Sequence, residues 1–346
     1  MTRPLSILDL TRLRAGETSS QALATTVEMA RLADALGYER YWFAEHHSAH
    51  GLASGAPEVM IAHVAAQTER IRVGSGGVML PNHAPLKIAE VFHLLEALHP
   101  GRIDLGLGRA PGTDQRTAFA LRRSAEAMSA DDYPERLAEL LAYEDHTFPT
   151  GHLFETISIT PDDVPLPPIW LLGSSAFSAQ LSAQMGLGFS FASHINRPAA
   201  VAAMNAYREQ FAPSSRFAAP HAILAASVVV GETIEAAQDL ATIVRVGIYR
   251  LLTGNMGPSP SLEDARKVEI PAAAAMQVQS MLGNQIIGTP ESVARELKAF
   301  ADETRADEVM LTSWIPDRDN RELVLREVMG AWQAIDVEAP TPIVTP

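Results

Sequence analysis

The stretch Arg40–Gly55, RYWFAEHHSAHGLASG, joins a run of strand-forming residues to an acid and two adjacent histidines. The aromatic residues 41–43 favour a β-strand, whereas the small residues after His47 cannot continue one. Glu45 and His46 therefore stand, with His47, at the carboxyl end of a strand. In a parallel α/β protein, that end of the sheet carries the active site.

The chain on both sides of this stretch repeats a strand followed by a helix. Units of about thirty residues without hairpin signals between them predict parallel βα repeats. The expected strands are, in order, 5–10, 40–44, 71–80, 102–108, 169–172, 188–192, 221–230 and 308–312. Eight strands alternating with helices over this length predict a (β/α)8 TIM barrel, with its active site in the loops that follow the strands.

Two segments interrupt the repeat. Residues 111–168 are expected to form an insertion after the fourth strand, containing a helix at 133–143 and a short strand at 155–160. Residues 253–285 are rich in glycine, proline and methionine, and we expect a second loop excursion there.

Composition limits the class of protein. The 346 residues are 47% hydrophobic, enough for a sizeable core, and we expect one domain over 1–337 followed by a mobile tail at 338–346. A net charge of −14 disfavours nucleic acid and anionic membrane surfaces as partners. The absence of cysteine excludes disulfides, thiolate metal sites and cysteine nucleophiles. No apolar run is long enough for a signal peptide or a membrane span, so a cytoplasmic protein is expected.

Two further motifs follow expected strands. The run LGLGRAPG (105–112) invites comparison with a dinucleotide fingerprint, but its third glycine comes one place late and Pro111 obstructs the next helix. Arg109 remains at a strand end, where a guanidinium suits a phosphate. The second motif, between a strand and a helix, contains Gly173, Ser174, Ser175 and Ser178. Free N–H groups at a first helical turn bind anions, so the two motifs predict a phosphate site on the same face as His46.

Several motifs in order resemble those of the bacterial luciferase-like superfamily of flavin-dependent monooxygenases, over nearly the whole chain. They are GYERYWFAEHH (37–47), IRVGSGGVMLP (71–81), GRIDLGLGR (101–109), GSS (173–175) and GTPE (288–291). The resemblance implies FMN as cofactor, used in its reduced form with O2 on a small organic substrate. It also implies a separate flavin reductase as partner, and a homodimer formed through the helices near 57–68 and 85–98.

The resemblance assigns roles to individual residues. His46 matches the catalytic histidine of the family, and Glu45 lies beside it. Matches to the cofactor site are Gly76 and Gly77, a cis-linked pair under the flavin ring, with Arg109, Ser174, Ser175 and Ser178 at the phosphate. His47 and His194 are candidates for the substrate pocket. Gly108 stands where the family has a reactive cysteine, and the aromatic pocket residues of luciferase are not found, so neither a long-chain aldehyde substrate nor light emission is implied.

Two alternatives stay open from the sequence. One is an oxidoreductase that transfers hydride with the deazaflavin F420, a cofactor that other members of the superfamily bind in the same barrel. The other is a hydrolase or isomerase barrel for a phosphorylated substrate, with His46, His47 and His50 as acid–base groups or metal ligands. The flavin hypothesis itself requires no metal site.

Overall fold

The computed structural model describes residues 3–125, 128 and 132–338, so almost all of the expected tail at 338–346 lies outside the described residues. The strands are β1 (Leu5–Asp9), β2 (Arg40–Phe43), β3 (Arg72–Ser75), β4 (Val78–Met79), β5 (Ile103–Gly108), β6 (Ile169–Gly173), β7 (Gly188–Ala192), β8 (Ala222–Val230), β9 (Gln285–Gly288) and β10 (Glu308–Thr312).

The helices along the first half of the chain are α1 (Ser19–Leu36), α2 (Pro57–Ala65), η1 (Leu80–Asn82), α3 (Pro85–Leu98), α4 (Gln115–Arg122), α6 (Tyr133–Asp145) and α7 (Ala176–Gln184). Those that follow are α8 (Ser193–Asn196), η2 (Arg197–Ala199), α9 (Ala200–Glu209), α10 (Ile234–Leu252), α11 (Leu262–Arg266), α12 (Ala272–Leu282), α13 (Pro290–Glu303), α14 (Arg318–Leu323), the π-helical turn η3 (Val324–Val328) and α15 (Met329–Glu338).

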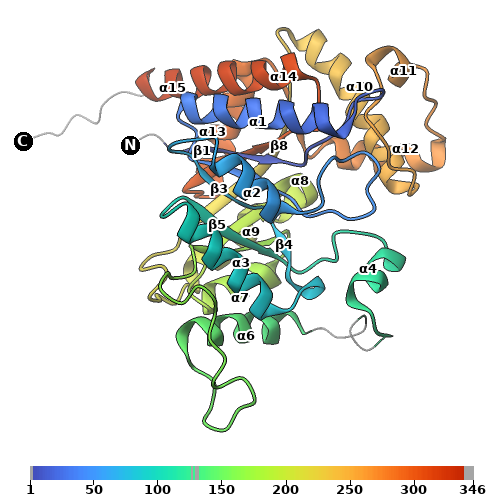
Figure 1. Cartoon of the computed structure of the whole chain (residues 1–346). Coiled ribbons are helices and arrows are strands. Elements are labelled where there is room, and N and C mark those ends of the chain that lie inside the picture. The colour runs from blue at the N-terminus through green and yellow to red at the C-terminus, as the bar shows by residue number, and fades with distance from the viewer. Residues whose placement is uncertain (1–2, 126–127, 129–131, 339–346) are drawn as a thin grey trace, which may run out of the picture.

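Eight parallel strands close into a barrel, which confirms the predicted TIM fold. The strands follow one another as β1, β2, β3, β5, β6, β7, β8 and β10, and β10 pairs in parallel with β1 to complete the circle. The helices surround the barrel, and the start of β1 and the end of α15 lie on the same side of the molecule (Figure 1). None of the helices in the described ranges is both long and apolar enough to cross a lipid bilayer.

Helix α1 shows how local sequence sets the ends of an element. The Thr18 side chain accepts a hydrogen bond from the Gln21 N–H (3.3 Å), and the Gln21 side chain accepts one from the Thr18 N–H (2.9 Å), which is a capping box. Gly37 ends the helix with φ 84°, a left-handed conformation that favours glycine. The helix is therefore fixed at both ends, and its buried face packs on the barrel wall.

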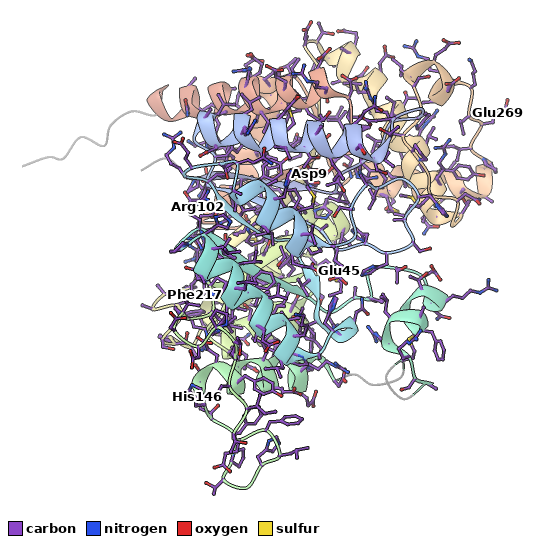
Figure 2. The ribbon with its side chains drawn as sticks, viewed as in Figure 1. Asp9, Glu45, Arg102, His146, Phe217 and Glu269 are labelled. Atoms are coloured by element: carbon purple, nitrogen blue, oxygen red, sulfur yellow. The ribbon has the colours of Figure 1, made fainter. Side chains whose placement is uncertain are left out.

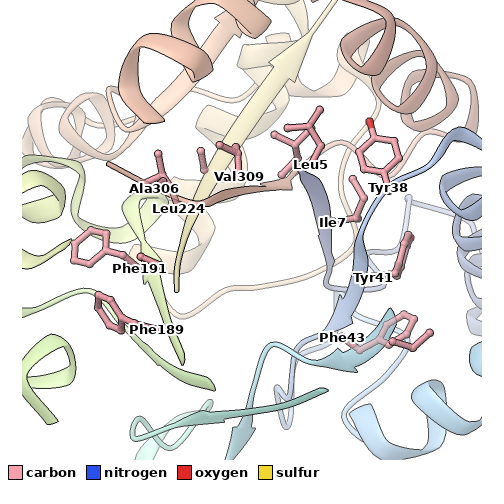
Figure 3. Close-up of a cluster of buried hydrophobic side chains, with 14 of the residues drawn as sticks. Leu5, Ile7, Tyr38, Tyr41, Phe43, Phe189, Phe191, Leu224, Ala306 and Val309 are labelled. Atoms are coloured by element: carbon pink, nitrogen blue, oxygen red, sulfur yellow. The ribbon is translucent and has the colours of Figure 1, made fainter. Parts of the chain in front are cut away.

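The hydrophobic core has an outer and an inner layer. In the outer layer, side chains of the strands point away from the barrel axis toward the helices, as Tyr41, Phe43, Phe189 and Phe191 do in Figure 3. The inner layer includes Leu8, Trp42, Trp170, Ile223 and Met310, with the two indoles in edge contact at 5.8 Å.

Buried charges occupy the barrel interior below this inner layer. Arg40 donates to Glu308 (2.9 Å) and to Asp104 (2.8 Å), so the buried charges compensate one another. These side chains fill part of the barrel interior near the amino-terminal ends of the strands.

The structure corrects several expected element bounds. The expected strand at 71–80 is divided into β3 and β4 by the cis peptide bond between Gly76 and Gly77. Residues 155–160 form no strand, because their N–H groups are used in local turns, such as Glu155 N to His152 O (3.0 Å). That part of the insertion projects from the barrel as a loop below α6 (Figure 1).

The second expected excursion, at 253–285, is also more regular than predicted. It contains α11 and α12, and it ends at the start of β9, which pairs with the carboxyl half of β8 (Ser227 opposite Gln285). Between β7 and α9 the chain forms the short turns α8 and η2. Extra structure therefore gathers at the carboxyl end of the barrel.

Candidate active site

A cavity of about 270 Å³ lies at the carboxyl ends of the strands. Its lining includes the predicted site residues His46, Gly76, Gly77, Arg109, Gly173, Ser174, Ser175, Ser178 and His194. The structure thus brings together every predicted site residue except Glu45 and His47. Much of the remaining wall is apolar, with Leu8, Leu10, Leu172, Ala225 and Met310 among its residues.

One wall of the cavity is bare backbone at Gly76 and Gly77. A Cβ atom added to Gly76 would lie 2.5 Å from Leu8 Cδ1, and one added to Gly77 would lie 2.7 Å from Gly106 O. Ser75 fixes this wall to β5, since its hydroxyl donates to Gly106 O (2.8 Å) and accepts from Gly106 N–H (2.9 Å). A side chain at Gly77 would collide with the backbone of β5, and one at Gly76 would have to displace the end of the Leu8 side chain. The two glycines offer a surface without side chains to a flat ring.

Donor groups gather at another part of the cavity, where β5 and β6 end. The guanidinium of Arg109 lies over the Phe177 ring, 4.5 Å from its centroid, and forms no ion pair with any residue in the described part of the chain. Ser175 begins α7, but its side chain accepts no capping hydrogen bond, so the first N–H groups of the helix remain available. A cation beside free helix N–H groups suits an anion such as a phosphate.

Two hydrogen bonds fix the loop at this subsite. Asn196 of α8 donates to Ser174 O (3.0 Å), and Ser178 donates to Ser175 O (3.0 Å). Sequence reasoning found the serines and Arg109 but missed Asn196 and Phe177. Phe177 lies inside the predicted motif, and an aromatic residue in the first turn of a helix was the available sequence signal. In the structure its side chain is exposed.

His46 presents one ring nitrogen to the cavity. Its Nδ1 donates to Gly112 O (3.3 Å), and because a carbonyl can only accept, Nε2 of the neutral ring carries no proton. Burial lowers the pKa of His46, and the neighbouring charge of Arg12 acts in the same direction. The imidazole is therefore neutral at neutral pH and can accept a proton at Nε2.

His194 is a second imidazole in the cavity wall, partly buried. Its Nδ1 donates to Ala225 O (3.4 Å), and burial lowers its pKa to about 4, with contributions from Arg12 and His46. Two histidines, one in the loop after β2 and one in α8, thus border the same space.

Glu45, labelled in Figure 2, is not among the residues that line the cavity, and its side chain joins three segments. Its carboxylate accepts hydrogen bonds from His47 (2.7 Å), His83 (2.9 Å) and the Met79 N–H (2.8 Å). Burial raises the pKa of Glu45, but these hydrogen bonds outweigh burial and leave it lowered, while the bond to Glu45 raises the pKa of His83. Sequence reasoning missed His83, although it follows an expected strand on the catalytic face.

The histidines of the opening motif do not form one cluster. His46 lines the large cavity and also borders a surface hollow that His47 lines, and His50 is exposed. No group of three or more His, Asp or Glu side chains within residues 3–125, 128 and 132–338 is placed to hold a metal ion. This arrangement gives no support to a metal-dependent hydrolase or isomerase.

A TIM barrel with a cavity of this kind is typical of enzymes that bind phosphorylated cofactors. The sequence matches the family described as luciferase-like monooxygenase over residues 4–308. A luciferase-like monooxygenase of Escherichia coli (strain K12) is 40% identical over 92% of this chain and 94% of that protein. The N-acetyl-S-alkylcysteine monooxygenase of Bacillus subtilis is 34% identical over 92% of this chain and 95% of that protein. The chain belongs to the luciferase-like monooxygenase family, and it is an oxidoreductase.

Solved structures agree with this assignment. The crystal structure of apo-MsnO8 has a TM-score of 0.86 and 36% identity, and the match covers 96% of this chain and 98% of that one. The fold is shared at lower identity by the oxygenating constituent of 3,6-diketocamphane monooxygenase from Pseudomonas putida in complex with FMN (TM-score 0.67, 18% identity, 95% and 98% covered). It is also shared by an F420-dependent secondary alcohol dehydrogenase (TM-score 0.65, 14% identity, 96% and 99% covered).

Proposed function

We propose that this oxidoreductase is a monooxygenase that uses reduced FMN and O2 to oxidise a small organic substrate. The observation that carries the proposal is the cavity itself, in which a side-chain-free wall at Gly76 and Gly77 and an uncompensated cation at Arg109 share one space. A flavin has a flat ring, which suits the glycine wall, and FMN carries one phosphate, which suits Arg109. A single ligand would therefore match both features. The FMN complex of a structure with the same fold supports this choice.

Each part of the ligand has a group in this chain to hold it. Arg109, Ser175 and Ser178 would bind the phosphate, with the backbone of Gly173 and Ser174 beside them, and Gly76 and Gly77 would lie against the ring. Bound reduced FMN would supply the electrons that activate O2. His46 would take or return a proton at Nε2, where its lowered pKa leaves a free lone pair.

The rest of the cavity protects the reaction from water. Leu8, Leu172 and Met310 exclude solvent from the space around the ring, as oxygen chemistry on a flavin requires. Glu45 would act by position, because its carboxylate holds the side chain of His47, next to His46, and the end of β4 through the Met79 N–H. His47 and His194 would border the substrate, His194 from within the cavity and His47 from the adjoining hollow.

Two partners complete the proposal. None of the sequence motifs binds nicotinamide, so a separate reductase would supply reduced FMN. A second copy of the chain would pack on α2 and α3, where the large apolar side chains Val59, Leu94 and Leu98 are exposed on neighbouring helices. We propose that residues 1–337 work as one domain within such a homodimer, in the cytoplasm.

Titration with FMN and with F420 tests the cofactor. The purified protein is expected to quench the fluorescence of FMN at micromolar concentration and to leave that of F420 unchanged. Binding of F420 in preference to FMN would replace the monooxygenase proposal by hydride transfer. Binding of neither would favour the hydrolase or isomerase alternative.

A further inference from the structure

Met79 places a thioether in the wall of the large cavity. It lines this cavity together with Gly76 and Gly77, and its side chain is only partly buried. Val78, the preceding residue of β4, belongs to the outer core layer, and successive side chains of a strand point to opposite faces. Met79 therefore points to the inside of the barrel, two residues beyond the glycine wall that the proposed function places against the flavin ring.

Two glycines make room for the side chain of Met79. Gly108 of β5 is its strand partner, and a Cβ atom added to Gly108 would lie 2.7 Å from Met79 Sδ and 3.2 Å from Met79 Cε. A Cβ atom added to Gly112 would lie 3.1 Å from Met79 Cγ. Gly108 itself lines the cavity. The thioether therefore lies over bare backbone at the edge of the cavity.

The backbone of Met79 is fixed in this position. Its N–H donates to Glu45 Oε2 (2.8 Å), and β4 pairs in parallel with β5. Met310 also lines the cavity, but it is packed in the inner core layer and only 1% exposed. Of these two cavity methionines, Met79 has the more accessible sulfur.

A thioether in this place is exposed to the chemistry of the cavity. Methionine takes up one oxygen atom to give the sulfoxide, which is polar where the thioether is apolar. The chain has no cysteine, so methionine is the only residue type that brings sulfur to the cavity. Under the proposed function, reduced FMN and O2 react in the same space. Without a substrate, Met79 is the oxidisable group beside the glycine wall.

We propose that Met79 is the site at which this enzyme oxygenates itself when reduced FMN is consumed without a substrate. One atom of O2 forms an S–O bond with Met79 Sδ as the O–O bond breaks, and the other atom leaves as water with two protons. The sulfur and the reduced FMN each give up two electrons, so methionine sulfoxide and oxidised FMN result. This inference rests on the proposed function for the oxidant, and on the position of Met79 for the acceptor.

Peptide mass spectrometry after turnover without substrate tests this site. Wild-type protein loaded with FMN is reduced without oxygen, and O2 enriched in heavy oxygen is then admitted with catalase present, which removes peroxide from solution. The heavy atom is expected in Met79 at about tenfold or more the level found in Met276, although Met276 is 84% exposed. Hydrogen peroxide added to flavin-free protein without catalase is expected to give the reverse order, because the exposed sulfur then reacts first.

Two variants check the assignment on the intact protein. Met79→Leu nearly keeps the side-chain volume and removes the sulfur, so it is expected to lose most of the heavy oxygen that the wild type takes up. Met276→Leu, the matched control, is expected to take up as much as the wild type. Equal uptake by Met79→Leu and the wild type overturns the proposal.

The outcomes also separate this proposal from the flavin function. Protein that binds and consumes reduced FMN but leaves Met79 unlabelled, or labels Met276 as much as Met79, overturns the self-oxygenation site and leaves the flavin function standing. Wild-type protein that binds no FMN in a fluorescence titration contradicts the flavin function, and with it the source of the oxidant.

Discussion

His46 and His47 are adjacent in the chain but lie in different surroundings. His46 borders the large cavity with Nε2 free, whereas Nε2 of His47 is bound to the carboxylate of Glu45 (2.7 Å). The two rings have different partners, since His46 Nδ1 is bound to Gly112 O (3.3 Å). Only one of the pair is placed to exchange protons with a molecule in the cavity.

Substitution of His46 tests this assignment. His46→Ala is expected to leave FMN affinity nearly unchanged and to lower substrate conversion by the ~10²–10⁴-fold typical of a lost acid–base group. The measurement is product formed per reduced FMN consumed, with a substrate that the wild type converts. His47→Ala serves as the matched control and is expected to retain most of the conversion. Equal loss in both variants would show that the motif is structural.

His194 makes the folded protein sensitive to acid. Its pKa is about 4 in the folded state against 6.5 in an exposed chain, so between these values only the unfolded state binds the proton. The free energy of unfolding therefore falls as the pH drops from about 6.5 toward 4, by roughly 2–3 kcal/mol for this residue. Above pH 6.5, His194 is neutral in both the folded and the unfolded state, so its titration no longer changes the free energy of unfolding.

Urea unfolding of His194→Asn at pH 7 and near pH 4.5 measures this contribution. The wild type is expected to lose roughly 2–3 kcal/mol more than the variant between the two pH values, since Asn cannot be protonated. His50→Asn, which changes an exposed histidine, is expected to behave like the wild type. The same pH dependence in all three proteins would contradict a neutral His194.

At the scale of elements, α2 and α3 present apolar side chains to solvent. Val59 of α2 and Leu94 and Leu98 of α3 are each more than half exposed. Exposed apolar side chains on neighbouring helices are typical of a protein interface, whereas scattered ones need no explanation. The two helices are the part of the surface best suited to a symmetric contact between copies.

The double change Leu94→Glu and Leu98→Glu is expected to convert the dimer into a monomer, because it would place four like charges in a two-fold interface. Light scattering at micromolar concentration measures the change in mass. Met276→Glu on α12 removes an equally exposed apolar side chain elsewhere and is expected to leave the dimer intact. A wild-type monomer would rule out the interface.

At the scale of the whole molecule, the barrel could be predicted because each unit carries a local signal. Apolar strands, helices ended by glycine and the spacing of the units were enough to place all eight barrel strands. The strand β9 was missed because four residues, QIIG, give no periodic pattern, and its pairing with β8 depends on how far β8 extends. The regular strands and helices could be predicted from local sequence, whereas the structure of the two excursions depends on packing against the barrel.

The candidate site was predictable to a similar extent. His46, Arg109 and the serines lie at strand ends, so strand prediction alone placed them on one face. The orientation of the Glu45 side chain could not be predicted, since it depends on hydrogen bonds to His83 and Met79, more than thirty residues away in sequence.

The affinity of Arg109→Ala for FMN and for riboflavin tests the central claim most directly. Riboflavin differs from FMN only in lacking the phosphate, and a charge-assisted hydrogen bond contributes ~1.5–3 kcal/mol. The variant is expected to bind FMN about 10- to 100-fold more weakly than the wild type does, and to bind riboflavin as the wild type does. Equal weakening for both ligands, or no weakening for FMN, would contradict an FMN site with its phosphate at Arg109.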